Sequence, residues 1–205
     1  MITNICIQND GYIQCESTFY QTLDILHPDI KIDLHTGINY LYGDIASGNW
    51  GISYLLSMYS YRSSEMQLFM PAEAVVDNVP MTLLELSPYT CYMDRIYPLF
   101  SSEENVRQLV QKSIEKTGME NCAEEIREMF HLDAERFERP LSQTGNEIFR
   151  MMAAIGYCEG KQVFCFPWLS RMRFESYHNQ LTATLDILET LGKIVIVPVG
   201  KLFLS

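Results

Sequence analysis

The chain has 205 residues, 47% of them hydrophobic, which is enough to fill the core of one domain or of a tight two-lobed one. Its 15 Lys and Arg residues against 26 Asp and Glu residues give a formal net charge of -11, which repels nucleic acid phosphates and anionic membrane surfaces. The sequence has no apolar run of about 18 residues and no basic, apolar N-terminal leader, so we expect a cytoplasmic chain with no direct membrane insertion and no nucleic acid partner.

The cysteines and histidines form no metal-binding or disulfide pattern. The six cysteines are Cys6, Cys15, Cys91, Cys122, Cys158 and Cys165. None belongs to a CxxC pair or has a histidine at ligand spacing, and the four histidines form no HExxH motif. We therefore expect reduced, mostly buried cysteines and no metal site.

The N-terminal residues are predicted to form antiparallel strands. Apolar and polar side chains alternate over residues 3–15 around Asp10-Gly11, a dipeptide that favours a tight hairpin turn. This pattern predicts two strands that pair with each other. A third strand is expected at residues 30–34.

The next segment predicts a strand, a glycine-bearing loop and a helix. Residues 37–43 are a β-branched and aromatic run that ends in glycine, and helical spacing of apolar residues begins after Gly48. Further on, prolines break the pattern, and short strands are expected at residues 66–70 and 81–86.

Residues 101–137 have a plainly helical pattern. Ser101 or Ser102 is the expected N-cap of the first helix, which ends at Gly118. A second helix is expected to begin near Asn121. These helices predict a helical subdomain.

The C-terminal part alternates helices and strands. Ser142 is the expected cap of a helix that leads into an apolar strand at residues 163–166. A helix at residues 176–191, with Gly192 at its C-terminal end, precedes a last strand at 194–197. The order predicts an α/β fold: a mostly parallel sheet covered by helices, with antiparallel N-terminal strands and a helical subdomain.

This element order, with the loop at residues 43–53, resembles the ABC ATPase family of P-loop NTPases across nearly the whole chain. In that family the loop reads GxxxxGK[ST]: backbone amides hold phosphates, the lysine reaches the β and γ phosphates, and the hydroxyl binds magnesium. Gly43 and Gly48 have the family spacing here. Asn49 stands at the lysine position and Trp50 at the hydroxyl position.

A shifted register remains open. It places Gly51, Ile52 and Ser53 at the Gly-Lys-Ser positions, which keeps a hydroxyl for magnesium but no lysine. No lysine occurs between Lys31 and Lys112, so the loop lacks this residue in either register.

Two further segments resemble family motifs. Residues 91–100 are similar to the Q-loop, with Asp94 near the glutamine position. The signature-like residues, in place of LSGGQ, are Leu141, Ser142 and Gly145. Gln143 and Thr144 replace the paired glycines, and their bulk is expected to block the close approach to a γ-phosphate that glycine permits.

Residues 162–170 resemble the Walker B strand and the Asp-Glu-Pro that follows it. Depending on a one-residue slip, the Asp and Glu positions hold Cys165 and Phe166, or Phe166 and Pro167. Residues 160–174 contain no carboxylate. This segment is therefore expected to supply neither a magnesium ligand nor a general base.

The resemblance implies a single ABC ATPase-like domain over residues 1–205. Residues 1–100 would hold the antiparallel strands and the loop, 101–140 the helical subdomain, and 141–205 the rest of the core. Gly200 or a neighbour stands where the family has its switch histidine.

The function expected from this comparison is that of a subunit without ATP hydrolysis. It would pair with itself or with an active ABC ATPase on a membrane permease, at the inner face of the membrane. Aromatic residues around the loop suit a protein-facing surface, although a place in the core is the alternative. They are Tyr40, Tyr42, Trp50, Tyr54, Tyr59 and Tyr61.

Two other functions remain open. In a nucleotide sensor or residual ATPase, Asp44 or Asp94 and Ser53 would bind ATP or ADP with magnesium weakly, and Arg95 or Arg150 would supply the missing positive charge. A free-standing regulatory protein with the same fold is the third hypothesis, because fold does not determine function.

Overall fold

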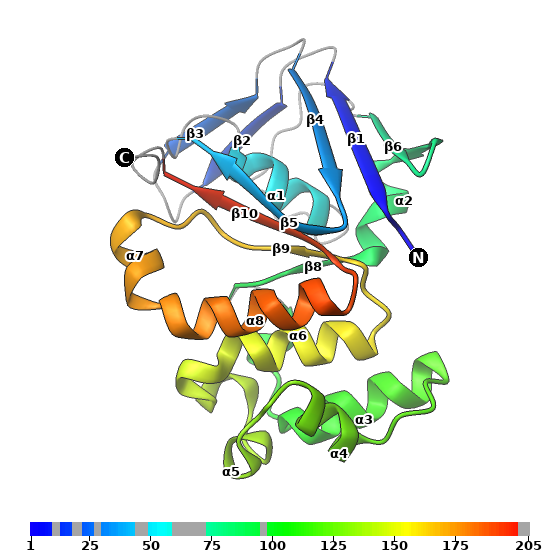
Figure 1. Cartoon of the computed structure of the whole chain (residues 1–205), viewed down its shortest axis with the longest axis vertical. Coiled ribbons are helices and arrows are strands. Elements are labelled where there is room, and N and C mark those ends of the chain that lie inside the picture. Colours follow the sequence, from blue (N-terminus) through cyan, green and yellow to red (C-terminus); the bar gives the residue numbers. More distant parts are fainter. Residues whose placement is uncertain are drawn as a thin grey trace.

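In the part of the chain that the computed structural model describes, strands form a four-stranded parallel sheet, a four-stranded antiparallel sheet and a two-stranded sheet (Figure 1). The described residues are 1–9, 13–17, 22–26, 30–43, 49–58, 73–94 and 98–200. The predicted α/β class, with antiparallel N-terminal strands and a helical subdomain, is confirmed.

The antiparallel sheet has the order β4-β1-β6-β7. Its strands are β1 (Asn4–Asn9), β4 (Ile30–His35), β6 (Glu73–Val76) and β7 (Val79–Thr82). Ile5 lies opposite Leu34 on one side and Val76 on the other, and all three side chains are buried. Cross-strand packing of these apolar residues holds the sheet together.

The predicted pairing of the first two strands is wrong. β1 pairs with β4 and β6, whereas β2 (Ile13–Ser17) pairs with β3 (Thr22–Leu26). The Asp10-Gly11 dipeptide, which lies outside the described residues, carries only local turn information. The partners of β1 come instead from apolar strands far along the chain.

The β6–β7 turn anchors the N-terminus of β1. Asp77 and Asn78 have positive φ angles of 48° and 68°, a conformation that Asp and Asn tolerate better than most residues. The Asp77 carboxylate accepts hydrogen bonds from the Thr3 hydroxyl at 2.6 Å and from the Asn4 amide at 2.9 Å. The pKa of Asp77 is lowered mainly by the Thr3 hydroxyl.

Asp77→Asn is expected to make the chain less stable at neutral pH. Because the folded-state pKa lies below its ordinary value of 3.8, the charged carboxylate stabilises the fold above that pH, and this contribution is lost as the pH falls through the folded pKa. Urea unfolding should therefore give the variant a lower free energy of unfolding than wild type at pH 7, and this difference should shrink in the acid range. An equal difference at both pH values would mean that turn geometry, rather than charge, is responsible.

The strand predicted at residues 81–86 is confirmed only at 81 and 82, which end β7, whereas residues 83–86 form a helix. The Thr82 hydroxyl accepts from the Glu85 amide at 3.2 Å, and the Glu85 carboxylate accepts from the Thr82 amide at 2.8 Å. This capping box starts α2 (Leu83–Leu86) and overrides the local β-propensity. The strand predicted at 66–70 lies outside the described residues.

The parallel sheet has the order β5-β10-β9-β8. Its strands are β5 (Gly37–Tyr42), β10 (Ile194–Val199), β9 (Val163–Cys165) and β8 (Thr90–Tyr92). All residues of β8, β9 and β10 are buried, as is usual for parallel strands covered on both faces. The parallel pairing brings the carboxyl ends of the four strands to one edge.

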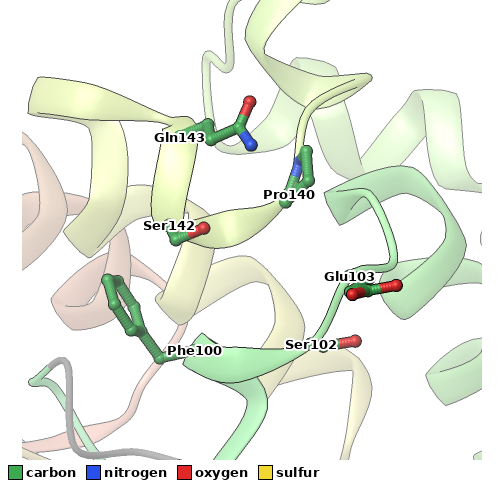
Figure 2. Close-up of a pocket in the computed structure, with 6 residues that line it drawn as sticks. All are labelled: Phe100, Ser102, Glu103, Pro140, Ser142 and Gln143. Atoms are coloured by element: carbon green, nitrogen blue, oxygen red, sulfur yellow. The ribbon is translucent and has the colours of Figure 1, made fainter.

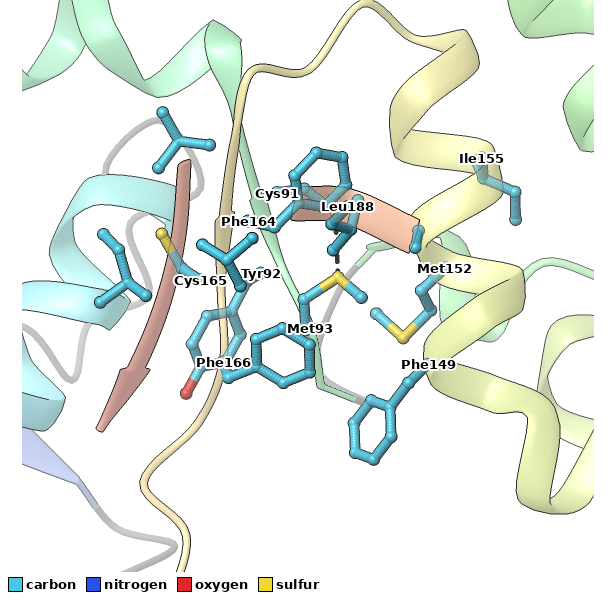
Figure 3. Packing of buried hydrophobic residues seen from close by; sticks show 14 of the residues in the cluster. Cys91, Tyr92, Met93, Phe149, Met152, Ile155, Phe164, Cys165, Phe166 and Leu188 are labelled. Carbon is cyan, nitrogen blue, oxygen red and sulfur yellow. Dashed lines mark hydrogen bonds between the residues drawn. The ribbon is translucent and has the colours of Figure 1, made fainter. Parts of the chain in front are cut away.

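Helices cover both faces of this sheet (Figure 1). α1 (Asn49–Met58) packs on one face, against β8, β9 and β10. α6 (Ile148–Cys158) and α8 (His178–Thr190) lie side by side on the other. In Figure 3 buried side chains fill the space between strands and helices on both faces, with Phe149, Met152 and Ile155 contributed by α6.

The helical subdomain lies beyond α6 (Figure 1). It contains α3 (Val106–Thr117), α4 (Ala123–Met129) and α5 (Ala134–Phe137). Asn105, not Ser101 or Ser102, is the N-cap of α3, because Asn105 and Gln108 form a capping box. The predicted end of α3 is confirmed: Gly118 adopts φ 70°.

The C-terminal elements follow the predicted alternation. α6 begins six residues after Ser142, because two short 3₁₀ helices, Leu141–Gln143 and Gly145–Glu147, come first, so Ser142 does not cap α6. The predicted helix at 176–191 is divided into α7 (Arg171–Ser176) and α8, and Gly192 follows α8 with φ 66°. None of the described helices is long and apolar enough to span a membrane.

Candidate functional site

The carboxyl ends of the parallel strands form the candidate site. Gly43 follows β5, and its amide donates to the Val199 carbonyl of β10 at 2.9 Å. The Met93 amide, just beyond β8, donates to the Cys165 carbonyl of β9 at 2.8 Å. In open α/β sheets this edge is where ligands bind, so its side chains decide what chemistry is available.

The structure places the predicted loop residues at this edge and in α1. Gly43 is buried, and Gly48 lies outside the described residues. Asn49 and Trp50 begin α1, and the structure describes their backbone alone. One turn further along, Ser53 is fully buried.

The Ser53 hydroxyl donates its hydrogen bond to another part of the protein. Its Oγ atom donates to the carbonyl oxygen of Phe166 at 2.5 Å, which ties α1 to the end of β9. The Ser57 hydroxyl in turn donates to the Ser53 carbonyl at 2.7 Å. Burial raises the pKa of the neighbouring Cys165 thiol, so this thiol stays protonated.

Ser53→Ala is expected to lower the free energy of unfolding by about 1–3 kcal/mol, because the buried Phe166 carbonyl loses its hydroxyl donor. Urea denaturation measures this loss. Ser57→Ala is the matched control: its hydroxyl only returns to a carbonyl of the same helix, so we expect a smaller loss. A Ser53→Ala variant as stable as wild type would mean that water reaches the Phe166 carbonyl and that the hydroxyl is available to a ligand.

The segment that resembles Walker B ends in apolar side chains, and the structure buries them. Cys165, Phe166 and Pro167 are buried, so neither one-residue alignment brings a carboxylate to the end of β9. The Phe166 ring packs against Phe149 of α6 with ring centroids 5.6 Å apart (Figure 3). Attack by water on a phosphate needs a base or a bound metal at such a position, and these side chains offer neither.

Trp168 is a site residue that sequence analysis did not single out. Its indole Nε1 donates to the Gly43 carbonyl at 3.2 Å, across 125 positions in the sequence. The indole also lies near Gly200, where a Cβ atom would be 3.6 Å from a Trp168 ring carbon. The tryptophan therefore covers the ends of β5 and β10, and only the fold brings these residues together.

Asp94, the residue at the Q-loop glutamine position, lies at this edge just beyond β8. It is partly buried, one residue beyond Met93, and it interacts with other groups in the structure. Within the described residues no three His, Cys, Asp or Glu side chains converge on a common metal position. Magnesium prefers several oxygen ligands, and the donor set here does not fit it: Ser53 bonds to a carbonyl and the positions after β9 are apolar.

The signature-like residues lie away from this edge, at the junction with the helical subdomain. Leu141 is buried, Ser142 is exposed, and Gly145 has φ 61°. Thr144 is buried and its hydroxyl donates to the Leu141 carbonyl at 2.8 Å, so its side chain serves the local turn.

An open cavity of about 530 Å³ lies beside the signature-like residues (Figure 2). Its lining residues are Phe100, Ser102, Glu103, Pro140, Ser142 and Gln143. Figure 2 shows Ser142 and Gln143 on one wall and Glu103 on another. The Glu103 carboxylate disfavours a phosphate in this cavity.

Neither the protein-family models nor the curated proteins match this sequence. Solved structures do. A protein from Pyrococcus furiosus, described as the ATP-binding protein of an ABC transporter, is 14% identical, with 96% of this chain and 90% of that chain covered and a TM-score of 0.59. An ATP-binding subunit of an ABC transporter is 9% identical, with 97% and 80% covered and a TM-score of 0.58. The chain therefore has the fold of ABC transporter ATP-binding proteins.

Proposed function

We propose that this chain is an ABC ATPase-like subunit that does not hydrolyse ATP. It forms a single domain that pairs with itself or with an active ABC ATPase, and it is attached to a permease at the inner face of the membrane. The observation that carries this proposal is the apolar end of β9. Cys165, Phe166 and Pro167 are buried there, and in either alignment two of them stand at the positions where hydrolysis needs carboxylates.

Two more features of the same edge support the proposal. The Ser53 hydroxyl, the magnesium ligand in the shifted register, already donates to the Phe166 carbonyl. The Trp168 indole donates a hydrogen bond to the carbonyl of Gly43, the first glycine of the loop. Phosphoryl transfer depends almost entirely on positioning and charge stabilisation, so the loss of lysine, magnesium ligands and base together removes its catalysis.

The nucleotide-sensor hypothesis is less well supported. It needs a cation or a metal to hold the phosphates, and the donor set described above does not fit magnesium. The version of this hypothesis that remains is weak binding of ATP or ADP through the backbone amides of the loop.

The pairing is tested by purifying the tagged chain in mild detergent from the cells that produce it naturally. We expect an ABC ATPase or a permease to copurify, or light scattering to show a homodimer of the isolated chain. Phosphate release from Mg-ATP by the isolated chain should equal the buffer blank. A monomer that copurifies with neither class of protein, or turnover above the blank that Ser53→Ala abolishes, would overturn the proposal.

A further inference from the structure

Strand β5 presents two aromatic side chains to solvent. Tyr40 is 38% exposed and Tyr42 is 45% exposed. Their positions two residues apart place them on one face of the strand, where the rings stack with centroids 6.1 Å apart and an interplanar angle of 27°. Exposed tyrosines of this kind are enriched at protein interfaces.

Two carboxylates of α8, which packs on β5, accompany this pair. Asp186 and Glu189 are both exposed and, three residues apart, share one face of the helix. The Oε1 atom of Glu189 lies 3.2 Å from the position that a Cβ atom on Gly37 would take, which puts this carboxylate at the start of β5. Both charges reach Tyr40: its pKa is raised by burial first, then by Tyr42, Asp186 and Glu189.

These carboxylates have no cationic partner in the part of the chain that the structure describes. Residues 174–192, which include all of α8, contain no Lys or Arg. The next lysine, Lys193, is 5% exposed and is turned away, with its ammonium 5.2 Å from the Tyr157 ring centroid. The surface therefore combines aromatic faces with uncompensated negative charge.

We propose that Tyr40, Tyr42, Asp186 and Glu189, together called the tyrosine–carboxylate surface, bind a segment of a partner protein that carries arginine or lysine. Aromatic faces attract guanidinium and ammonium groups, and adjacent carboxylates pair with them. Charge complementarity selects this partner. A second copy of this chain, with a net charge of -11, matches this negatively charged surface less well than a basic segment does, and so does a nucleic acid. The proposal does not depend on whether the chain binds nucleotide.

A fluorescent peptide of alternating arginine and glycine residues tests this surface by anisotropy, at about 0.15 M salt so that long-range attraction is screened. We expect saturable binding to the whole chain. Tyr40→Ala with Tyr42→Ala, or Asp186→Asn with Glu189→Gln, should weaken it more than about fivefold. A peptide of alternating glutamine and glycine should not bind.

The matched control is Glu115→Gln with Glu120→Gln, which removes two exposed carboxylates from the helical subdomain. It changes the net charge by the same amount as the α8 pair and should leave binding unchanged. Urea midpoints of all variants establish that each is folded. Equal weakening in the control, no peptide binding by the wild type, or equally tight binding of the glutamine peptide would each overturn the proposal.

Discussion

Phe166→Glu is expected to destabilise the fold by more than about 4 kcal/mol, enough to leave much of the chain unfolded. The Phe166 side chain is fully buried and packs against Phe149, so a carboxylate there would be buried without a partner. In an active site of this fold, the same position would accept an acid. The free energy of unfolding of the variant, measured by chemical denaturation, therefore shows whether the end of β9 can hold the carboxylate that catalysis needs.

Phe166→Leu is the control for this experiment. It keeps the position apolar, at a cost of about 1 kcal/mol. A loss below about 1 kcal/mol for Phe166→Glu would show that water reaches residue 166, and the proposal of a non-hydrolytic site would lose its main support.

Gly156→Val is expected to cost about 3 kcal/mol, because α6 packs closely against the parallel sheet at this glycine. A Cβ atom there would lie 3.0 Å from the Cε1 atom of Phe164 and 3.2 Å from the Sγ atom of Cys91. Valine adds this Cβ atom and two methyl groups to the crowded position. Its effect is measured as the shift in the urea unfolding midpoint.

The control places the same side chain on a helix position that is only half-buried. Ala183→Val, on the half-buried side of α8, should cost about 0.6 kcal/mol through helix propensity alone. A Gly156→Val variant no less stable than Ala183→Val would mean that α6 can move away from Phe164 and Cys91.

Much of the fold could be predicted because the deciding signals are local. Gly118 and Gly192 end helices with positive φ angles, as expected. The buried face of α3 follows its apolar spacing, with Val106, Leu109 and Ile114 all buried. Signals of this kind require only that neighbouring residues be compared.

The structure differs from the sequence-based prediction where contacts between distant residues, or a helix cap, determine the local structure. β1 pairs with β4 and β6, and no local turn signal identifies such partners. The Thr82–Glu85 capping box is present in the sequence as Thr-x-x-Glu, but the apolar residues around it favour a strand. The expectation of mostly buried cysteines is confirmed in part: Cys91, Cys158 and Cys165 are buried, whereas Cys6 is half-buried and Cys122 is exposed. Burial raises the pKa of Cys158 to about 12.

The candidate site also has features that the sequence predicts and features that only the fold reveals. The apolar character of residues 165–167 is evident from the sequence, and the structure adds that they are buried. The bonds of Ser53 to Phe166 and of Trp168 to Gly43 join residues 113 and 125 positions apart, so only the three-dimensional fold shows them. The exposure of Tyr40 and Tyr42 favours the predicted protein-facing role over a place in the core.

Calorimetric titration of the purified chain with ATP and ADP in the presence of magnesium tests the central claim most directly. We expect no heat of binding up to about 1 mM nucleotide, because the loop has no lysine, the described residues offer no magnesium ligand set, and the Trp168 indole bonds to the first glycine of the loop. Binding with a dissociation constant of about 1–100 μM would contradict it, and would show that the loop holds phosphates through backbone amides, as a nucleotide sensor would.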